Sequence, residues 1–217
     1  AHLALCLVGE GEVMVDGCRR KTEDVFGQMG IKPLRIHLRE GLALTNGTSV
    51  MTAIGLINVL RAKRLIELSV TLSSMINEVV GAFDDHFSEE LNMAKRHKGQ
   101  REIARTMRYI LATSRCIRKR ENYFYNQEIK DNFIEHKVQE YYSLRCVPQI
   151  LGAIADEADN AERILLDELN SASDNPIIDV KTGNVYHGGN FHGDYVAFEM
   201  DKLKTGITKL TMLAERH

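Results

Sequence analysis

The 217-residue chain lacks the features that mark several classes of protein. It has no apolar run near the roughly 20 residues that span a bilayer, so we expect no membrane partner. Its four cysteines are far apart and form no CxxC pair, which favours reduced thiols in a cytoplasmic protein over a disulfide framework. Only three prolines occur, and no low-complexity linker or internal repeat is visible. The length therefore suits one domain, or two small ones at most.

An excess of one charge is also lacking, because 28 Lys and Arg residues stand against 30 Asp and Glu. That balance argues against a dedicated nucleic-acid-binding or membrane-surface protein. Locally the charge is uneven, since residues 95–120 hold ten Lys or Arg against Glu102 alone. Aromatic residues are sparse there, and residues 156–174 hold seven acids against Arg163. We therefore expect no nucleic-acid partner and interpret the basic stretch as a solvated or inter-subunit face, with a helical RNA-binding module as the alternative.

Motifs of several enzyme classes are missing as well. There is no phosphate-binding GxGxxG or GxxxxGK[ST], and no GxSxG nucleophile elbow. His187 and His192 are five positions apart, with no cysteine or carboxylate at the usual ligand spacing unless Asp194 counts. The four acids between residues 84 and 90 are typical of a solvated helix start or loop. We predict that the chain binds no metal.

Three long segments do show the periodicity of helices. They run from about Thr48 to Val80, from about Pro148 to Leu169, and from about Asp194 onward. Their apolar positions step by three and four in three rows: Leu65, Leu68, Leu72, Met75 and Val79; Ile150, Ile154, Ala158, Ala161 and Leu165; Val196, Met200, Leu203, Ile207, Leu210 and Ala214. Such rows favour facing helices that cross at shallow angles.

Helices of this length determine the expected fold. A helix of about 30 residues is roughly 45 Å long, more than a compact globule of this size needs. Long helices of this kind pack in bundles, often across subunits. The strand signals are short: a hairpin arm at residues 9–17 and a hairpin at 177–186, with the cap and first turn of a short helix at 22–25. We predict a mainly α fold, a long-helix bundle with short β-hairpins.

The two ends of the chain lie inside structural patterns. The sequence opens in the apolar run Ala1–Val8 without a methionine, and it stops at Arg216–His217 inside a helical pattern without a Gly or Asn stop signal. We therefore expect residues 1–217 to be an internal segment, truncated at both ends.

Three segments carry polar residues that local structure does not demand. They are GLALTNGT at 41–48, KVQEYYSLRC at 137–146, and HGGNFHG at 187–193. Taken singly, each has a structural interpretation: a helix cap by Asn46 or Thr48, a capping loop with one surface arginine, and a plain loop. The paired glycines of the third segment also allow a close approach of the backbone to another group.

Taken together, these segments resemble one family. The strings EGLALTNGT, KVQEYYSLRCVPQ, NSASDNPI and GGNFHG, in this order and at these separations, are similar to those of the histidine, phenylalanine and tyrosine ammonia-lyases. The resemblance covers essentially all 217 residues. The opening AHLALCLVGEGE resembles the stretch downstream of the family's Ala-Ser-Gly triplet, which cyclises into the electrophilic methylidene-imidazolone (MIO) group. That triplet does not occur in residues 1–217.

The resemblance implies roles for five residues. Arg145 is expected to bind the substrate carboxylate through its guanidinium fork. Tyr142 is expected to lie beside the MIO group and to take part in proton transfer. Asn46 and Gln139 are expected to hold the MIO group or the substrate by hydrogen bonds. Phe191 is expected to pack near the MIO group. The family's catalytic tyrosine on an N-terminal loop and a functional glutamate in the C-terminal part lie outside these residues.

The resemblance also implies a reaction and an assembly. Residues 1–217 are expected to form the central part of the ammonia-lyase domain, in a homotetramer whose active sites draw residues from three subunits. The reaction is the elimination of ammonia from an amino acid, with histidine as the first choice of substrate, tyrosine close behind and phenylalanine also open. An aminomutase reaction stays open too. The chain alone is expected to be inactive, and a natural short paralogue that binds or scaffolds without catalysis is the alternative.

Overall fold

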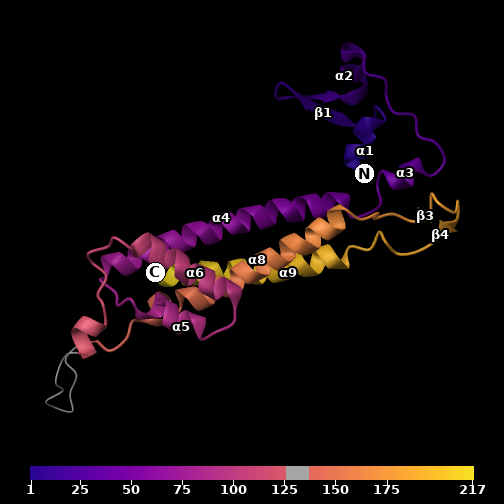
Figure 1. Cartoon of the computed structure of the whole chain (residues 1–217). Helices are drawn as coiled ribbons and strands as arrows, with labels where there is room; N and C mark the ends of the chain where they lie inside the picture. Colours follow the sequence, from indigo (N-terminus) through magenta and orange to yellow (C-terminus); the bar gives the residue numbers. More distant parts are fainter. Residues whose placement is uncertain (126–136) are drawn as a thin grey trace. The chain divides into compact units, whose positions relative to one another are not determined.

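A computed structural model of the protein describes residues 1–125 and 137–217 (Figure 1). It is mostly helical, which confirms the predicted fold class. The chain divides into two compact units. The first unit comprises residues 1–49 and 171–193, and the second comprises residues 50–170 and 194–217. The prediction that residues 1–217 form the central part of one lyase domain stays a prediction.

The second unit is built on four longer helices that lie side by side in Figure 1: α4 (Ser49–Val79), α6 (Lys98–Leu111), α8 (Val147–Leu169) and α9 (Asp194–Arg216). Three of them match the predicted helices closely. Pro148 lies in the first turn of α8, where its missing N–H costs no helical hydrogen bond. The shorter helix α6 lies within the basic stretch at residues 95–120. Shorter elements complete the unit: η1 (Asp85–Phe87), α5 (Glu89–Met93), η2 (Glu121–Tyr125) and α7 (Tyr142–Arg145).

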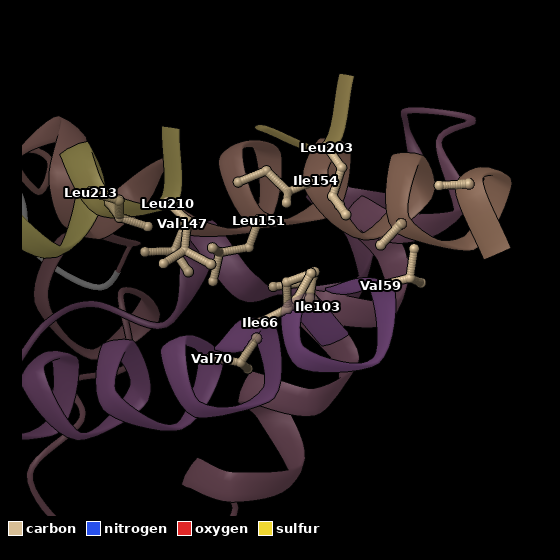
Figure 2. Packing of buried hydrophobic residues seen from close by; sticks show 14 of the residues in the cluster. Val59, Ile66, Val70, Ile103, Val147, Leu151, Ile154, Leu203, Leu210 and Leu213 are labelled. Atoms are coloured by element: carbon tan, nitrogen blue, oxygen red, sulfur yellow. The ribbon is translucent and has the colours of Figure 1, made fainter. Parts of the chain in front are cut away.

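A single hydrophobic cluster joins the four helices of the second unit (Figure 2). On α8 and α9, the buried residues are largely those predicted from periodicity. The buried face of α4 is a different one, made by Val59, Ala62, Ile66 and Val70. The predicted row on α4 is exposed: Leu65 44%, Leu68 54%, Leu72 47%, Met75 52% and Val79 85%.

The small residues of α4 explain which of its apolar faces is buried. Gly55 lies so close to α8 that an added Cβ would be 3.2 Å from Leu165 Cδ2. Ala62 is 2% exposed on the same side of the helix. Small residues leave room on this side of α4 for the side chains of Leu165 and Met200, which larger residues would displace. The row predicted from its spacing is therefore a second apolar face, which no described residue of the chain covers fully.

Helices α6 and α8 cross at a pair of glycines. A Cβ added at Gly99 would lie 2.1 Å from Gly152 O, and a Cβ added at Gly152 would lie 2.4 Å from Gln100 N. The Oδ1 atom of Asp156 on α8 accepts a hydrogen bond from Gly99 N at 2.8 Å, so α8 caps the first turn of α6. The two backbones therefore touch without side chains between them.

Arginines of the basic stretch hold loops of the second unit in place by hydrogen bonds. Arg101 donates to Lys95 O at 2.7 Å, and Arg108 donates to Phe87 O at 2.8 Å. Arg120 donates to Val138 O at 2.6 Å. These guanidinium groups satisfy backbone carbonyls of the same chain, a structural use that the sequence interpretation as a solvated or inter-subunit face missed.

The first unit holds short helices and two hairpins: α1 (His2–Leu7), β1 (Glu12–Val15), β2 (Cys18–Lys21), α2 (Thr22–Met29), α3 (Glu40–Ala43), β3 (Ile177–Ile178) and β4 (Val185–Tyr186). Both predicted hairpin signals are confirmed. Asp16 and Gly17 turn the first hairpin with positive φ angles of 50° and 76°, as tight hairpins require. The predicted cap of α2 is off by one residue, because Lys21 occupies the cap position and Thr22 is already helical and buried.

No described helix is long and apolar enough to cross a membrane.

Candidate active site

Three of the predicted site residues meet at the start of α8. Arg145 donates a hydrogen bond from Nη1 to Gln139 Oε1. The guanidinium carbon of Arg145 lies 4.6 Å from the centroid of the Tyr142 ring, a cation–π contact. We call Gln139, Tyr142 and Arg145 the Gln–Tyr–Arg cluster. The segment at 137–146 is therefore more than a capping loop with one surface arginine.

The Gln–Tyr–Arg cluster has hydrogen-bonding capacity to spare. Tyr142 is 74% exposed, and Gln139 is exposed as well. Arg145 is half-buried, and within the described part of the chain its Nε atom has no hydrogen-bond partner. A guanidinium has five N–H donors, so the bond to Gln139 leaves donors for an anionic ligand. A carboxylate is the ligand that matches this fork.

The backbone under the cluster is held firmly. Leu144 is 6% exposed and anchors the single turn of α7 in the core. The last residue of the chain, His217, lies with Nε2 2.7 Å from Ser143 O. Helix α8 starts directly after Cys146, so the cluster stands at the N-terminal end of a 23-residue helix. A rigid support of this kind is what a binding site requires to keep its geometry.

The segment that carries Asn46 lies in the first unit. Asn46 is exposed, and its backbone N–H donates to Leu42 O at 2.8 Å in the turn after α3. Gly47 follows with φ 91°, and a Cβ there would lie 2.6 Å from Ser173 O. The backbone N–H of Thr48 donates to Ser173 Oγ at 3.5 Å. Only glycine fits at position 47, because both the positive φ and the close backbone require it.

The segment that carries Phe191 touches the same stretch of chain. Asn190 Nδ2 donates to Ala172 O at 3.3 Å, and Gly188 N donates to Asn175 Oδ1 at 2.6 Å. Phe191 itself is 40% exposed. Residues 172–175 thus contact both the Asn46 and the Phe191 segments.

Sequence reasoning missed the linking role of residues 172–175. They belong to the string NSASDNPI, which carried part of the resemblance, yet no residue in it was given a role. Arg39 adds a further tie, because it donates to the backbone oxygen of Asn175 and lies 3.4 Å from Asp174 Oδ2. Its φ of 75° is unusual for a residue with a side chain. That outlier, and the side-chain bonds, become visible only in the structure.

A second polar cluster lies between α8 and α9. Glu199 is 4% exposed and accepts a hydrogen bond from Asn160 Nδ2 at 3.1 Å. Lys202 Nζ lies 2.7 Å from Glu199 and 3.8 Å from Glu157. Burial and the neighbouring Glu199 carboxyl raise the pKa of Glu157, with Lys202 opposing. One lysine thus contacts two carboxylates, an arrangement typical of a structural ion cluster between helices.

Metal ligands are not gathered in the described residues. No three His, Cys, Asp or Glu side chains within residues 1–125 and 137–217 lie close enough to hold an ion. His187 and His192 are both exposed. The four cysteines are free thiols.

Comparison with known families identifies the chain. The model of the aromatic amino acid lyase family matches residues 1–217. The chain belongs to this family. All four motif strings therefore fall inside the matched region, and the resemblance stated from them is confirmed.

Relatives of this family member are named for two different reactions. It is 37% identical to a tyrosine 2,3-aminomutase of Myxococcus sp. (strain Mx-B0) over 224 residues, covering 100% of the chain and 42% of the relative. It is also 37% identical to the histidine ammonia-lyase of Caldanaerobacter subterraneus subsp. tengcongensis over 216 residues, covering 100% of the chain and 40% of the relative. The chain thus spans about two fifths of the length of these curated relatives.

Solved structures share the fold of this family member. The phenylalanine aminomutase of Pantoea agglomerans superposes with a TM-score of 0.92 at 33% identity, covering 99% of the chain and 42% of that structure. The histidine ammonia-lyase of Trypanosoma cruzi gives a TM-score of 0.83 at 31% identity, covering 99% and 38%. The long-helix fold is therefore that of ammonia-lyases and aminomutases.

Proposed function

We propose that this chain is the central part of an enzyme that eliminates ammonia from an aromatic L-amino acid without oxidation. Histidine would give urocanate, and tyrosine or phenylalanine would give an arylacrylate. The observation that carries the proposal is the Gln–Tyr–Arg cluster, in which Arg145 keeps donors for a carboxylate. Membership of the aromatic amino acid lyase family supports the reaction class.

Arg145 and Gln139 would bind and orient the substrate. The guanidinium of Arg145 takes the α-carboxylate through two parallel N–H donors. Gln139 accepts one further N–H of the same group, which fixes the plane of the fork. A fixed plane sets the direction in which the α- and β-carbons extend from the carboxylate, and orientation of this kind lowers the activation barrier.

Tyr142 would serve proton transfer. Its ring is held under the Arg145 guanidinium while most of its surface stays open. The exposed phenol oxygen of Tyr142 would exchange a proton with the bound substrate as a general acid or base. Phe191 would pack near the MIO group, as the resemblance implies.

The MIO group would come from residues outside this chain, because Ala-Ser-Gly does not occur in residues 1–217. The residues present fit such a group. Asn46 and Gln139 are exposed amides on segments whose backbones are fixed, and they would hold it by hydrogen bonds. When bound, the group supplies an electrophilic carbon that engages the substrate and allows the β-proton and the amine to leave. Hydrogen-bond donors fixed in advance favour negative charge that develops on its ring oxygen.

Assembly as a homotetramer in the cytoplasm forms part of the proposal. The leucine row of α4 supports it, since five large apolar side chains, each at least 44% exposed, form a second face on one helix. Large apolar side chains gathered and exposed on one face are typical of an interface. Other copies of the chain would cover this face in the complete enzyme. Its partners are then a small amino acid and copies of itself.

A substitution at Arg145 tests the proposed site. In the complete enzyme, Arg145→Lys should lower kcat/KM about 10- to 100-fold, because a point charge replaces a bidentate fork. The assay follows urocanate, coumarate, cinnamate and the β-amino acid, each from its own parent amino acid. The product that forms then identifies the substrate and separates a lyase from an aminomutase.

Arg163→Lys provides the matched control for Arg145→Lys. Arg163 is an exposed arginine of α8 that contacts Asn160 and Asp167 on its own helix. Its replacement should leave kinetics unchanged. Equal kinetics for the two variants would remove Arg145 from the site.

A further inference from the structure

We infer that Glu140 is a positioning residue for the Gln–Tyr–Arg cluster, holding its loop on a buried platform formed by Phe83. This inference rests on the proposed function of that cluster. Glu140 follows Gln139 directly and precedes Tyr142 by two residues. Its role would be to fix the backbone from which both side chains project.

The carboxylate of Glu140 is buried and fully engaged. Its side chain is only 2% exposed, between neighbours that are exposed on both sides. The Oε1 atom accepts a hydrogen bond from the backbone N–H of Phe83 at 3.3 Å, and the Oε2 atom accepts one from Lys137 Nζ. A buried carboxylate is costly unless it is hydrogen-bonded and paired. Glu140 therefore meets the conditions under which a buried charge holds two segments together.

The platform that receives Glu140 is rigid. Phe83 is 1% exposed, and the guanidinium carbons of Arg118 and Arg120 lie 4.8 and 4.9 Å from its ring centroid. The neighbouring Ala82 donates from its backbone to Asn77 O at 2.9 Å and accepts from Arg118 N at 2.9 Å. The segment is thus tied to the end of α4. A loop bound to Phe83 is therefore held in a fixed position relative to the helix bundle.

A second tie acts on the other side of Gln139. Arg120, whose guanidinium stacks on Phe83, donates to Val138 O at 2.6 Å. The backbone is therefore fixed at position 138 and the side chain at position 140, with Gln139 between them. Gln139 in turn accepts the hydrogen bond of Arg145. The chain of contacts runs from Phe83 through Glu140 and Gln139 to the guanidinium that would bind the carboxylate.

The test compares Glu140→Ala with Glu140→Gln in the complete enzyme. Alanine leaves the Phe83 N–H without an acceptor and frees the loop, so kcat/KM should fall about 10- to 100-fold. Most of this fall should come from a higher KM, because Gln139, the hydrogen-bond partner of Arg145, is no longer held in position. Glutamine keeps an amide oxygen for the Phe83 N–H, so its kcat/KM should stay within about threefold of the parent.

Two measurements other than turnover accompany the kinetics. Hydrogen exchange followed by mass spectrometry should show faster exchange of the Phe83 amide in Glu140→Ala than in Glu140→Gln. Isothermal calorimetry uses urocanate, coumarate or cinnamate, whichever product the assay identifies. This product should bind Glu140→Ala more weakly than the parent, by a factor similar to the rise in KM. Unchanged Phe83 exchange or unchanged product binding in Glu140→Ala would overturn the inference.

Glu199→Ala and Glu199→Gln are the matched controls. Glu199 is equally buried and is bonded to a lysine and an amide, but it lies between α8 and α9. Its variants should lose stability without raising KM. Should Glu140→Ala behave in the same way, its role is structural only and the inference is overturned.

Arg145→Lys, measured in the same series, tests the proposed function of the Gln–Tyr–Arg cluster separately from the positioning role of Glu140. When Arg145→Lys is impaired and Glu140→Ala is not, the positioning role fails alone. When Arg145→Lys has unchanged kinetics, the proposed site fails, and the positioning role fails with it.

Discussion

At the scale of single residues, the buried His86 makes the stability of the protein depend on pH. His86 is 4% exposed, and its Nε2 lies 2.9 Å from Asn77 Oδ1. Asn77 Nδ2 already donates to Ser73 O, so the proton must sit on His86 Nε2. Burial lowers the pKa of His86 to about 4, although the carboxylates of Asp84, Asp85 and Glu140 act to raise it.

The low pKa of His86 predicts that stability falls as the pH is lowered through the range from 6.5 to 4. In this range the unfolded chain takes up a proton that the folded chain refuses, so the free energy of unfolding decreases. The total loss from this group reaches about 3 kcal/mol near pH 4. Thermal unfolding of the complete protein against pH measures it. His86→Gln should flatten the curve, whereas replacement of the exposed His97 should not. Parallel curves for the parent and His86→Gln would contradict the assignment.

Site residues were predictable from the sequence to the extent that motifs carry them. Gln139, Tyr142 and Arg145 were named from a resemblance, and the structure brings these three together. Their roles in catalysis remain predictions. Glu140 was not singled out, because its acceptor role depends on Phe83, which lies 57 positions earlier in the chain. A contact over such a separation leaves no local signal.

At the scale of elements, the crossing of α6 and α8 depends on the absence of two side chains. Gly152→Ala should destabilise the protein by about 1–3 kcal/mol or more, because a methyl group there would overlap the backbone of Gln100. Chemical denaturation measures the change. Gly27→Ala in α2 is the control, since nothing lies within 4 Å of its added Cβ. That change should be neutral or stabilising by about 0.5–1 kcal/mol. A Gly152→Ala variant as stable as its parent would mean that the helices can separate at little cost.

Helices were predicted well where the apolar periodicity extends over many residues. The buried face was predicted poorly where one helix carries two apolar faces. The long helices follow from periodicity alone. The buried face of α4 does not, because the helix carries apolar residues on two faces and only the small residues identify the one that packs on α8. Helix α6 is shorter, and its charged residues conceal the apolar positions Ile103 and Met107.

At the scale of the whole molecule, we predict that the 217-residue chain alone has no lyase activity, because it does not encode the Ala-Ser-Gly triplet. Assay of the purified chain with histidine, tyrosine and phenylalanine should give no acrylate product. The complete enzyme serves as the positive control. Product formed by the pure chain would refute the requirement. A gene that encodes these residues and nothing more would favour the binding or scaffolding paralogue.

The organisation of the molecule was the least predictable level. A chain of this length allowed two small units, yet the sequence does not show that residues 171–193 return to the unit formed by residues 1–49. That return depends on contacts such as Gly47 against Ser173 and Arg39 with the backbone oxygen of Asn175. Each joins segments separated by more residues than local patterns cover.

The two apolar faces of α4 limit how its sequence can change over evolution. One face contributes Val59, Ala62 and Val70 to the hydrophobic cluster, and the other presents the leucine row. A helix constrained on both sides keeps few positions where a polar substitution is neutral, and these lie at its charged residues, such as Arg64 and Glu67. Among the helices of the second unit, α4 should therefore accumulate substitutions most slowly.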